Sequence, residues 1–479
     1  MIDDPANMEL TPAQMTAMGE AVVARAVAHI AALPAAPSCG DFTDIEALCR
    51  SMREVAPELG TDLDTLLDQL FDEWIPRSFT TTGPGYLAYI PGGGVYPAAL
   101  ADFISDTANR YTGIWLAAPA LVQLEANVLE WARDWMCFPQ TTRGLFTTGG
   151  SMAIFNAIAC AREQLLGNDI RSGTLYVSSQ SHHSIVKSAK LAGIAHDRVR
   201  IIDVDNQFRL RVDELESAIA ADCRAGLKPF MVFSNAGTTN TGAVDPINVV
   251  ADIAAREGLW HHVDGAYGGF FHMVPELRPL LSGLPRADSL SLDPHKGMFL
   301  PYGTGLLLVR NGEALRALHS SSAGYLPDNQ SEFYDPAQYG PELSRGFPGL
   351  RVWLTIKIFG AERYRAALQE KRDLAVWAAE QIARIPGIVM DAFPQLSLFA
   401  FHIEEDGLAT IEAQNAATEA LVHRVTNRGQ VMMSGAMAGE RYLGRVCVLS
   451  FRTRRAQMEV CVRQLAEETA ALLAEAAAR

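Results

Sequence analysis

The sequence is poor in cysteine, short of positive charge and free of long hydrophobic runs, and each shortage excludes a class of protein. Its 7 cysteines are scattered and include no CxxC pair, which argues against a disulfide framework or a cysteine-based metal site. The 40 Lys and Arg residues against 55 Asp and Glu residues leave a net charge of −15, so nucleic acid and anionic membranes are unfavourable partners. No run approaches the roughly 18 consecutive apolar residues of a membrane-spanning helix.

The N-terminus likewise lacks the pattern of a secretion signal. Residues 1–5 read MIDDP, an acidic start without a basic segment that leads into an apolar one. Together with the scattered cysteines, this start predicts a cytoplasmic protein with reduced thiols. The 479 residues, 49% hydrophobic and 20% charged, predict one large globular domain with smaller appendages.

Strand and helix patterns alternate through the middle of the chain. The short β-rich runs lie at residues 174–177, 199–202, 230–233 and 260–263. The helical stretches between most of them lie at residues 184–194, 212–222 and 247–257. This alternation predicts an α/β fold whose mainly parallel central sheet is covered by helices.

Helical spacing also marks both ends of the chain. Residues 8–32 and 43–76 have it, and a Gly/Pro-rich loop at 83–94 interrupts the pattern. Near the other end, 411–427 and 455–477 have amphipathic helical patterns. We therefore predict three parts: an N-terminal helical segment (1–94), a large α/β domain (95–368) and a small C-terminal α/β domain (369–479).

An acid and a lysine 32 residues apart carry the first chemical signal. Asp264 follows the apolar run 259–263, and Lys296 ends the sequence DPHK at 293–296. A lysine amine can form an imine with the aldehyde of pyridoxal phosphate, while a carboxylate keeps the pyridine nitrogen protonated so that the ring accepts electrons. The pair alone is weak, because both residue types are common on surfaces and Asp264 could equally cap a helix.

A glycine-rich turn upstream supplies a third element. The sequence TTGGS at 147–151 follows an apolar run and opens a helix pattern at 152–158. Glycines let the backbone approach an anion closely, and the free N–H groups at the start of a helix favour phosphate. A plain strand-to-helix turn is the alternative, but Asp264 and Lys296 downstream favour the phosphate site.

The histidine pairs and one small-residue loop leave alternatives open. His182 follows a strand pattern and either stacks on a flat cofactor or lies in an ordinary loop. A metal site built from His182, His183, His261 and His262 lacks the spacing of known ligand motifs, so no metal is expected. The sequence NAGTTNTG at 235–242 either contacts a cofactor ring or is simply a loop.

In this order the motifs resemble the pyridoxal-phosphate-dependent amino-acid decarboxylases of the aromatic-L-amino-acid, glutamate and tyrosine decarboxylase group. The resemblance runs from about Tyr86 to the C-terminal helix and includes PGYLAYIP at 84–91, WLAAPA at 115–120 and LSRGF at 343–347. It implies the aspartate-aminotransferase-like fold of type I enzymes, with pyridoxal 5′-phosphate as cofactor. It also implies a homodimer, with the active site at the subunit interface and the N-terminal segment interlocking the two chains.

The resemblance implies five residues around the cofactor ring. Lys296 would bear the imine, and Asp264 would pair with the ring nitrogen. His182 would stack on one face of the ring and Ala266 would pack on the other. Thr238 would lie near the ring.

Four further residues match the family's anion-binding positions. Gly150 and Ser151 would bind the phosphate at the helix start, and His295 would lie beside it. Arg452 matches an active-site arginine, whose guanidinium suits a phosphate or a substrate carboxylate.

The residues that match the family's substrate-contacting positions imply an activity. Tyr89 and Ile90 lie at positions that contact the substrate side chain. Tyr89 matches the aromatic-specific members, whereas Ile90 replaces a bulky aromatic residue expected there. Tyr325 matches a loop tyrosine that, alone or together with His182, would return a proton after carbon dioxide leaves. The implied reaction is α-decarboxylation of an L-amino acid to an amine, with an aromatic substrate as first choice. The alternatives are an aldehyde-forming decarboxylation–deamination, a decarboxylase of an acidic or diamino acid, and a non-catalytic binding protein. Intact Lys296, Asp264 and Tyr325 argue against the last.

Overall fold

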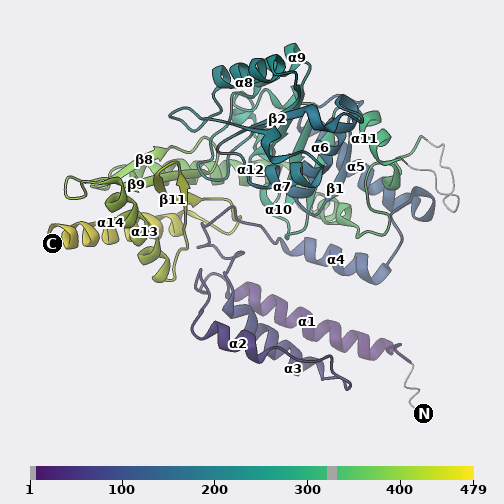
Figure 1. Cartoon of the computed structure of the whole chain (residues 1–479). Helices are drawn as coiled ribbons and strands as arrows, with labels where there is room; N and C mark the ends of the chain where they lie inside the picture. The colour runs from purple at the N-terminus through teal and green to yellow at the C-terminus, as the bar shows by residue number, and fades with distance from the viewer. Residues whose placement is uncertain (1–6, 321–331, 479) are drawn as a thin grey trace.

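The computed structural model describes residues 7–320 and 332–478, which form an N-terminal helical arm and two α/β domains (Figure 1). The arm consists of α1 (Pro12–Ala32), α2 (Ile45–Ser51), α3 (Leu63–Asp68) and the π-helical turn η1 (Gln69–Trp74). A capping box starts α1, because the side chains of Thr11 and Gln14 each accept the other residue's backbone N–H. The arm lies below both domains in the view of Figure 1.

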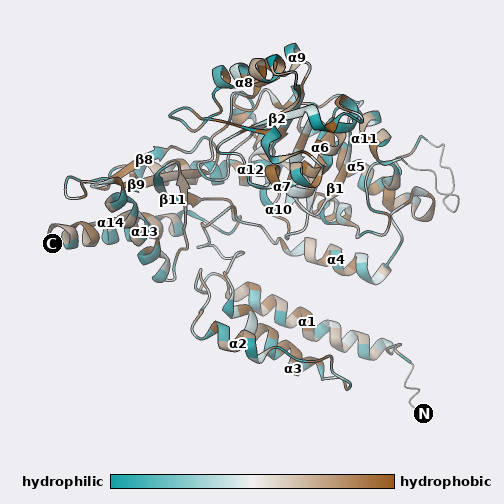
Figure 2. Cartoon of the chain, viewed as in Figure 1, coloured by the Kyte–Doolittle hydropathy of each residue, from teal (hydrophilic) through white to brown (hydrophobic). Residues whose placement is uncertain are grey.

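The arm leaves much apolar surface in contact with solvent. No residue of α1 or α2 is buried, and Figure 2 shows apolar positions along the whole length of α1. The exposed apolar side chains of α1 are Met15, Met18, Val22, Val23 and Val27. An exposed apolar surface of this kind commonly marks an interface with another protein.

The large domain is built on a seven-stranded sheet with the order β1-β7-β6-β5-β4-β2-β3. The strands are β1 (Arg143–Thr147), β2 (Gly173–Ser178), β3 (Val199–Ile202), β4 (Lys228–Asn235), β5 (Trp260–Asp264), β6 (Ser289–Leu292) and β7 (Gly305–Val309). All neighbouring pairs are parallel except the two that involve β7. The predicted α/β class with a mainly parallel central sheet is therefore confirmed.

Helices cover both faces of this sheet. They are α4 (Tyr96–Ala108), α5 (Pro119–Trp135), α6 (Gly150–Leu165), α7 (Ser184–Leu191), α8 (Val212–Arg224), α9 (Ile247–Glu257) and α11 (Gly312–His319). Alternate side chains of β7 separate into two hydrophobic clusters: Leu307 and Val309 pack with α6, whereas Leu306 and Leu308 pack with α5. Burial on both faces explains why β7 is apolar along its whole length, with the sequence GLLLV.

The small domain carries an antiparallel sheet of order β10-β11-β9-β8. Its strands are β8 (Ile388–Ala392), β9 (Leu398–Ile403), β10 (Ser434–Ala438) and β11 (Arg441–Cys447), and its helices are α13 (Ile411–Asn427) and α14 (Arg455–Ala477). The long helix α12 (Pro348–Ile382) joins the two domains and breaks at Gly360, whose φ of 76° is non-helical. The proposed boundary at residue 368 lies within α12, beyond this break.

None of the helices in residues 7–320 and 332–478 combines the length and hydropathy that a bilayer crossing demands.

Candidate active site

A cavity of about 480 Å³ opens where the central strands β1, β4, β5 and β6 end. Crevices at the carboxyl ends of parallel strands are the usual ligand sites of open α/β sheets. Nine of the residues predicted for the site line this cavity: Tyr89, Ile90, Gly150, Ser151, His182, Asp264, Ala266, His295 and Lys296. Segments more than 200 residues apart in the sequence thus meet at one place.

Lys296 lies on the one-turn helix α10 (Pro294–Gly297), which follows β6 directly. Its Nζ is 2.8 Å from Oδ2 of Asp293, and its side chain keeps 23% of its surface exposed. Burial lowers the pKa of Lys296, but attraction to Asp293 and the hydrogen bond that the amine donates to it outweigh burial, so the pKa lies above its ordinary value. The amine is thus accessible from the cavity and held in place by its neighbour.

Asp264 ends β5 and is buried at the floor of the cavity. Its Oδ1 accepts hydrogen bonds from the Ser291 hydroxyl and the Ala266 backbone N–H, both at 3.1 Å. The next helical turn begins only at Gly269, so Asp264 does not cap a helix. These bonds fix the orientation of the carboxylate and leave its other oxygen free of protein donors among the described contacts.

The turn from β1 into α6 forms a cradle for an anion. Gly149 has a φ of 157°, which glycine adopts far more readily than other residues. A Cβ on Gly150 would lie 3.1 Å from the Cβ of Ala266 and 3.3 Å from Oδ2 of Asp293. A side chain there would crowd the cavity, whereas glycine leaves the first N–H groups of the 16-residue helix α6 open to a ligand.

Two histidines complete the wall around this cradle. The Nδ1 of His182 is 2.7 Å from the Ser184 hydroxyl, and the Nδ1 of His295 is 2.8 Å from the Thr304 carbonyl oxygen. Because a carbonyl can only accept, His295 donates from Nδ1, and its Nε2 stays available for another partner. Burial lowers the pKa of His182, although the nearby Asp264 opposes this effect. His182 is therefore a neutral, oriented ring at ordinary pH.

Comparisons with known proteins agree with this geometry. Residues 46–404 match the family model described as the pyridoxal-dependent decarboxylase conserved domain. The chain is also 33% identical over 472 residues to the aromatic-L-amino-acid decarboxylase of Bacillus atrophaeus, covering 96% of this chain and 97% of that protein. The chain belongs to the pyridoxal-dependent decarboxylase family.

Further relatives and solved structures support the same family. The L-tyrosine/L-DOPA decarboxylase 2 of Lophophora williamsii is 28% identical over 460 residues, covering 89% of this chain and 88% of the relative. The 4-hydroxyphenylacetaldehyde synthase of Rhodiola rosea is 28% identical over 436 residues, covering 88% of each chain. The crystal structure of Oryza sativa TDC with PLP and tryptamine superimposes with a TM-score of 0.92 at 24% identity, over 97% of this chain and 99% of that one. The predicted type I fold is confirmed.

The cofactor of this decarboxylase is pyridoxal 5′-phosphate, and the cavity fits it. When bound, the cofactor supplies an electron sink for the bond that breaks at the α-carbon. The N–H groups at the start of α6 would hold the phosphate, and the Asp264 carboxylate would face the ring nitrogen. The Oδ1 of Asp293 is buried without a partner in the described structure, which indicates a polar ligand beside Gly150.

Two predicted site residues do not line the cavity. Thr238 is buried, and its hydroxyl lies 2.9 Å from that of Thr241, while its neighbours Gly237 and Thr239 line the wall. Arg452 donates to the Thr82 carbonyl oxygen at 3.1 Å, away from the lining residues. Tyr325 lies outside the described residues, and its role stays a prediction.

Two residues at or beside the site, Asp293 and Arg445, were given no role from the sequence, and Asn235 was included only as the first residue of the loop 235–242. Asp293 lies one helical turn before Lys296, so the spacing i, i+3 was the available signal. Asn235 lies opposite Asp264 in the register of β4 and β5, and a polar residue at the end of an apolar strand could have indicated it. Arg445 donates to the carbonyl oxygens of Tyr89 and Thr239, and only the tertiary structure brings these together.

Asn235 is fixed by a buried acid. Its backbone N–H and its side-chain Nδ2 both donate to Oδ2 of Asp245, each at 2.7 Å. Complete burial raises the pKa of Asp245 to about 6, although these hydrogen bonds lower it in part. Asp245 therefore holds the loop after β4 against the floor of the cavity.

We expect Asp293→Asn to move the pH profile of cofactor capture towards lower pH. Only a neutral amine can attack an aldehyde, and attraction to Asp293 raises the pKa of the Lys296 amine. Removing the charge lowers this pKa, so the neutral fraction appears at a lower pH. The measurement is the rate of absorbance change when cofactor is mixed with cofactor-free protein across pH. The control is Asp252→Asn, which changes an exposed carboxylate in the same way. An unchanged pH profile in Asp293→Asn contradicts the claim that Asp293 raises the pKa of Lys296.

Proposed function

We propose that this decarboxylase acts on an aromatic L-amino acid and releases the amine and carbon dioxide. The observation that carries the substrate class is the composition of the substrate end of the cavity. Tyr89 and Ile90 line it, and Phe79 stacks behind Tyr89 with ring centroids 6.3 Å apart. In the described wall the only charged basic side chain is Lys296, and no arginine lines the cavity to pair with a distal carboxylate.

The names of the relatives support the same substrate class. The Bacillus atrophaeus relative is an aromatic-L-amino-acid decarboxylase, and other relatives are tyrosine or tyrosine/DOPA decarboxylases. For a diamino substrate, the wall offers Asp264 and Asp293 as carboxylates. Since Asp264 faces the cofactor ring in the family pattern and Asp293 pairs with Lys296, neither is free for a distal ammonium group.

The experiment is a comparison of kcat/KM across three substrate classes. The holoenzyme is given tyrosine, phenylalanine and tryptophan, then glutamate and aspartate, then ornithine and 2,4-diaminobutyrate, and the amine is measured. We expect the aromatic class to exceed the others by at least about 100-fold, because burying an unpaired charge in this wall costs several kcal/mol. A preference for an acidic or diamino substrate overturns the proposal.

We propose that Tyr325 donates the proton that completes amine formation. The family pattern supports this role, since a phenol next to the α-carbon can protonate it as soon as carbon dioxide has left. If the proton is late, dioxygen and water can react at that carbon, which yields aldehyde, ammonia and hydrogen peroxide. The relatives include a protein named phenylacetaldehyde synthase, from Arabidopsis thaliana, which supports aldehyde formation as the alternative to test.

We expect Tyr325→Phe to lose carbon dioxide more slowly, by about 10²-fold, and to shift the product from amine towards aldehyde with peroxide. Amine, aldehyde and peroxide are measured separately from one reaction. Tyr111→Phe is the matched control, because this tyrosine is exposed and is not among the residues that line the cavity. Identical product ratios in wild type and Tyr325→Phe would leave His182 as the next candidate donor.

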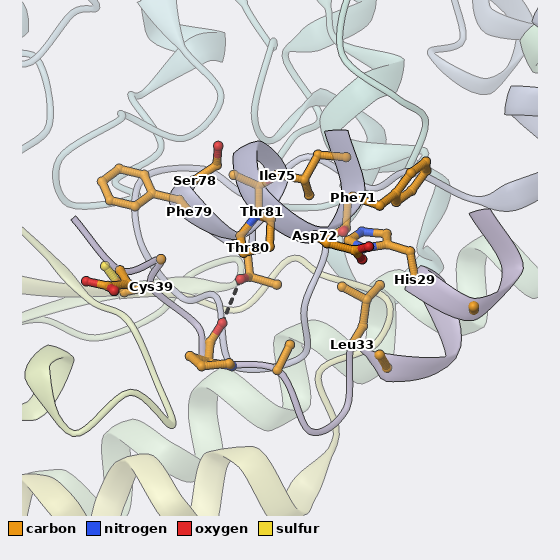
Figure 3. A pocket seen from close by; sticks show the side chains of 18 of the residues that line it. His29, Leu33, Cys39, Phe71, Asp72, Ile75, Ser78, Phe79, Thr80 and Thr81 are labelled. Carbon is orange, nitrogen blue, oxygen red and sulfur yellow. Dashed lines mark hydrogen bonds between the residues drawn. The ribbon is translucent and has the colours of Figure 1, made fainter. Parts of the chain in front are cut away.

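We also propose a homodimer in which the N-terminal arm packs on the partner. The exposed apolar side chains of α1 support this, and so does a second cavity of about 600 Å³ between α1, η1 and residues 76–82 (Figure 3). Phe71 and His29 lie at one end of this cavity and Phe79 at the other. Because Phe79 also stacks on Tyr89, a partner seated on the arm would lie next to the substrate end of the active site.

Charges placed on α1 should separate the dimer. We expect Val23→Asp combined with Val27→Asp to give a particle of the 52.0 kDa chain mass and the wild type to give twice that mass. Each valine buried at the interface contributes roughly 1.5–3 kcal/mol to the free energy of association, so replacing two of them by charged residues should prevent dimer formation. Light scattering after size exclusion measures the mass, and Val249→Asp on α9, equally exposed, is the control. A monomeric wild type contradicts the proposal.

We propose a cytoplasmic location as well, which is supported by seven cysteines that all remain unpaired in the fold. Fractionation of cells that express the chain tests this location.

A further inference from the structure

Tyr89 has an unusual backbone conformation for a residue that lines the active-site cavity. Its φ is +51°, in the left-handed region. A residue with a Cβ pays a free-energy cost there, and an aromatic side chain makes no local hydrogen bond that offsets it. The conformation persists only because neighbouring structure holds it, so the contacts of the Tyr89 backbone matter for the shape of the cavity.

Both polar backbone groups of Tyr89 are held by the small domain. Its N–H donates to the hydroxyl of Ser434 at 3.0 Å, and its carbonyl oxygen accepts from Nη2 of Arg445 at 3.1 Å. Nη1 of Arg445 also donates to the Ser434 hydroxyl at 2.8 Å. Ser434 on β10 and Arg445 on β11 are direct partners in the antiparallel register, so the sheet fixes the distance between them.

Arg445 also holds a second segment of the cavity wall. It donates to the carbonyl oxygens of Thr239, from Nη2, and Asn240, from Nε at 3.3 Å. Thr239 lines the cavity, as Tyr89 does. The guanidinium is buried, and all its hydrogen-bond acceptors are neutral oxygens. One side chain of the small domain therefore ties together two segments of the cavity wall, one at Tyr89 and one at Thr239.

We propose that Ser434 and Arg445 are positioning residues that determine substrate selectivity by holding Tyr89 in its left-handed conformation. Neither side chain lines the cavity, so both act through Tyr89 and not by touching the substrate. The proposal rests on the proposed aromatic substrate, because it places the aromatic contact at Tyr89. If the hold is lost, Tyr89 relaxes to negative φ and its ring leaves the substrate position.

The test starts from Ser434→Ala, which removes the acceptor for the Tyr89 N–H. We expect KM for the aromatic substrate to rise about fivefold to tenfold, with kcat changed less than about twofold. The dissociation constant of L-tyrosine methyl ester, which cannot lose carbon dioxide, should rise by the same factor in an absorbance titration of the holoenzyme. Ser434→Thr keeps the oxygen and should restore both values.

The Tyr89→Gly variant distinguishes an effect of Ser434 through the Tyr89 backbone from a general structural effect. Glycine takes positive φ without strain, so Ser434→Ala should change the ester's dissociation constant less than about twofold in a Tyr89→Gly background. An undiminished effect in that background overturns the proposal, as does a wild-type KM in Ser434→Ala. A wild type that does not turn over aromatic amino acids instead refutes the proposed function, and the two failures are thereby distinguished.

Discussion

Replacing Lys296 with alanine should lower kcat by about four orders of magnitude, equivalent to roughly 5 kcal/mol of transition-state stabilisation. Lys296 is the only lysine among the described residues that line the cavity, and its amine is 2.8 Å from Oδ2 of Asp293. Without the amine the cofactor would lose its covalent attachment and keep the contacts predicted at the start of α6 and at Asp264, so it should bind loosely and dissociate on dialysis. Carbon dioxide release from the best substrate and absorbance of the bound cofactor are the measurements.

A surface lysine provides the matched control for this change. Lys228→Ala removes a half-exposed lysine that pairs with Asp169 on the surface, and we expect it to keep wild-type activity. Circular dichroism should show that both variants fold. Borohydride treatment of the wild type should attach the cofactor to the peptide that contains Lys296, and attachment to another lysine would refute the assignment.

Replacing Asp264 with asparagine should lower kcat/KM by about 10²- to 10³-fold, or roughly 3–4 kcal/mol. The amide has almost the same shape, but a neutral group does not stabilise a proton on the ring nitrogen. Since Ser291 and Ala266 hold the side chain through donors at 3.1 Å, the geometry should survive and the loss should be electrostatic. The measurement is steady-state decarboxylation with saturating cofactor.

A modified cofactor isolates this electrostatic effect. A pyridoxal phosphate whose ring nitrogen carries a methyl group has a fixed positive charge and needs no stabilised proton. It should recover part of the activity of Asp264→Asn while giving wild type no gain. Asp252→Asn on the surface is the control. Activity near that of wild type in Asp264→Asn with the natural cofactor would mean that the carboxylate has no role at the ring.

The elements that carry the catalytic groups could be predicted because their signals are local. An apolar run that ends in an acid predicted Asp264 at the end of β5, and a glycine turn before a helix pattern predicted the cradle at the start of α6. Both depend on a few consecutive residues whose strand and helix preferences agree with the final fold. The parallel sheet followed from the alternation of such segments.

The features of the site that the sequence did not predict depend on contacts between segments that are far apart in the chain. Residues 84–91 lie beside the small domain, where Met432 pairs with Tyr86 and the Cys447 N–H donates to the Leu87 carbonyl oxygen. No local pattern encodes this contact, and the left-handed Tyr89 depends on it. The family resemblance assigned Arg452 to the site, and that role stays a prediction. In the structure Arg452 donates to the Thr82 carbonyl oxygen, while Arg445 donates to the carbonyl oxygens of Tyr89 and Thr239.

The most direct test of the account is a product balance from the holoenzyme with its best aromatic L-amino acid. Carbon dioxide, amine, aldehyde and hydrogen peroxide are measured from the same reaction, and borohydride-treated enzyme serves as the blank. The account predicts one amine for each carbon dioxide, with negligible aldehyde and peroxide. Carbon dioxide matched by aldehyde and peroxide would contradict amine formation, and no carbon dioxide from any amino acid would contradict the decarboxylase itself.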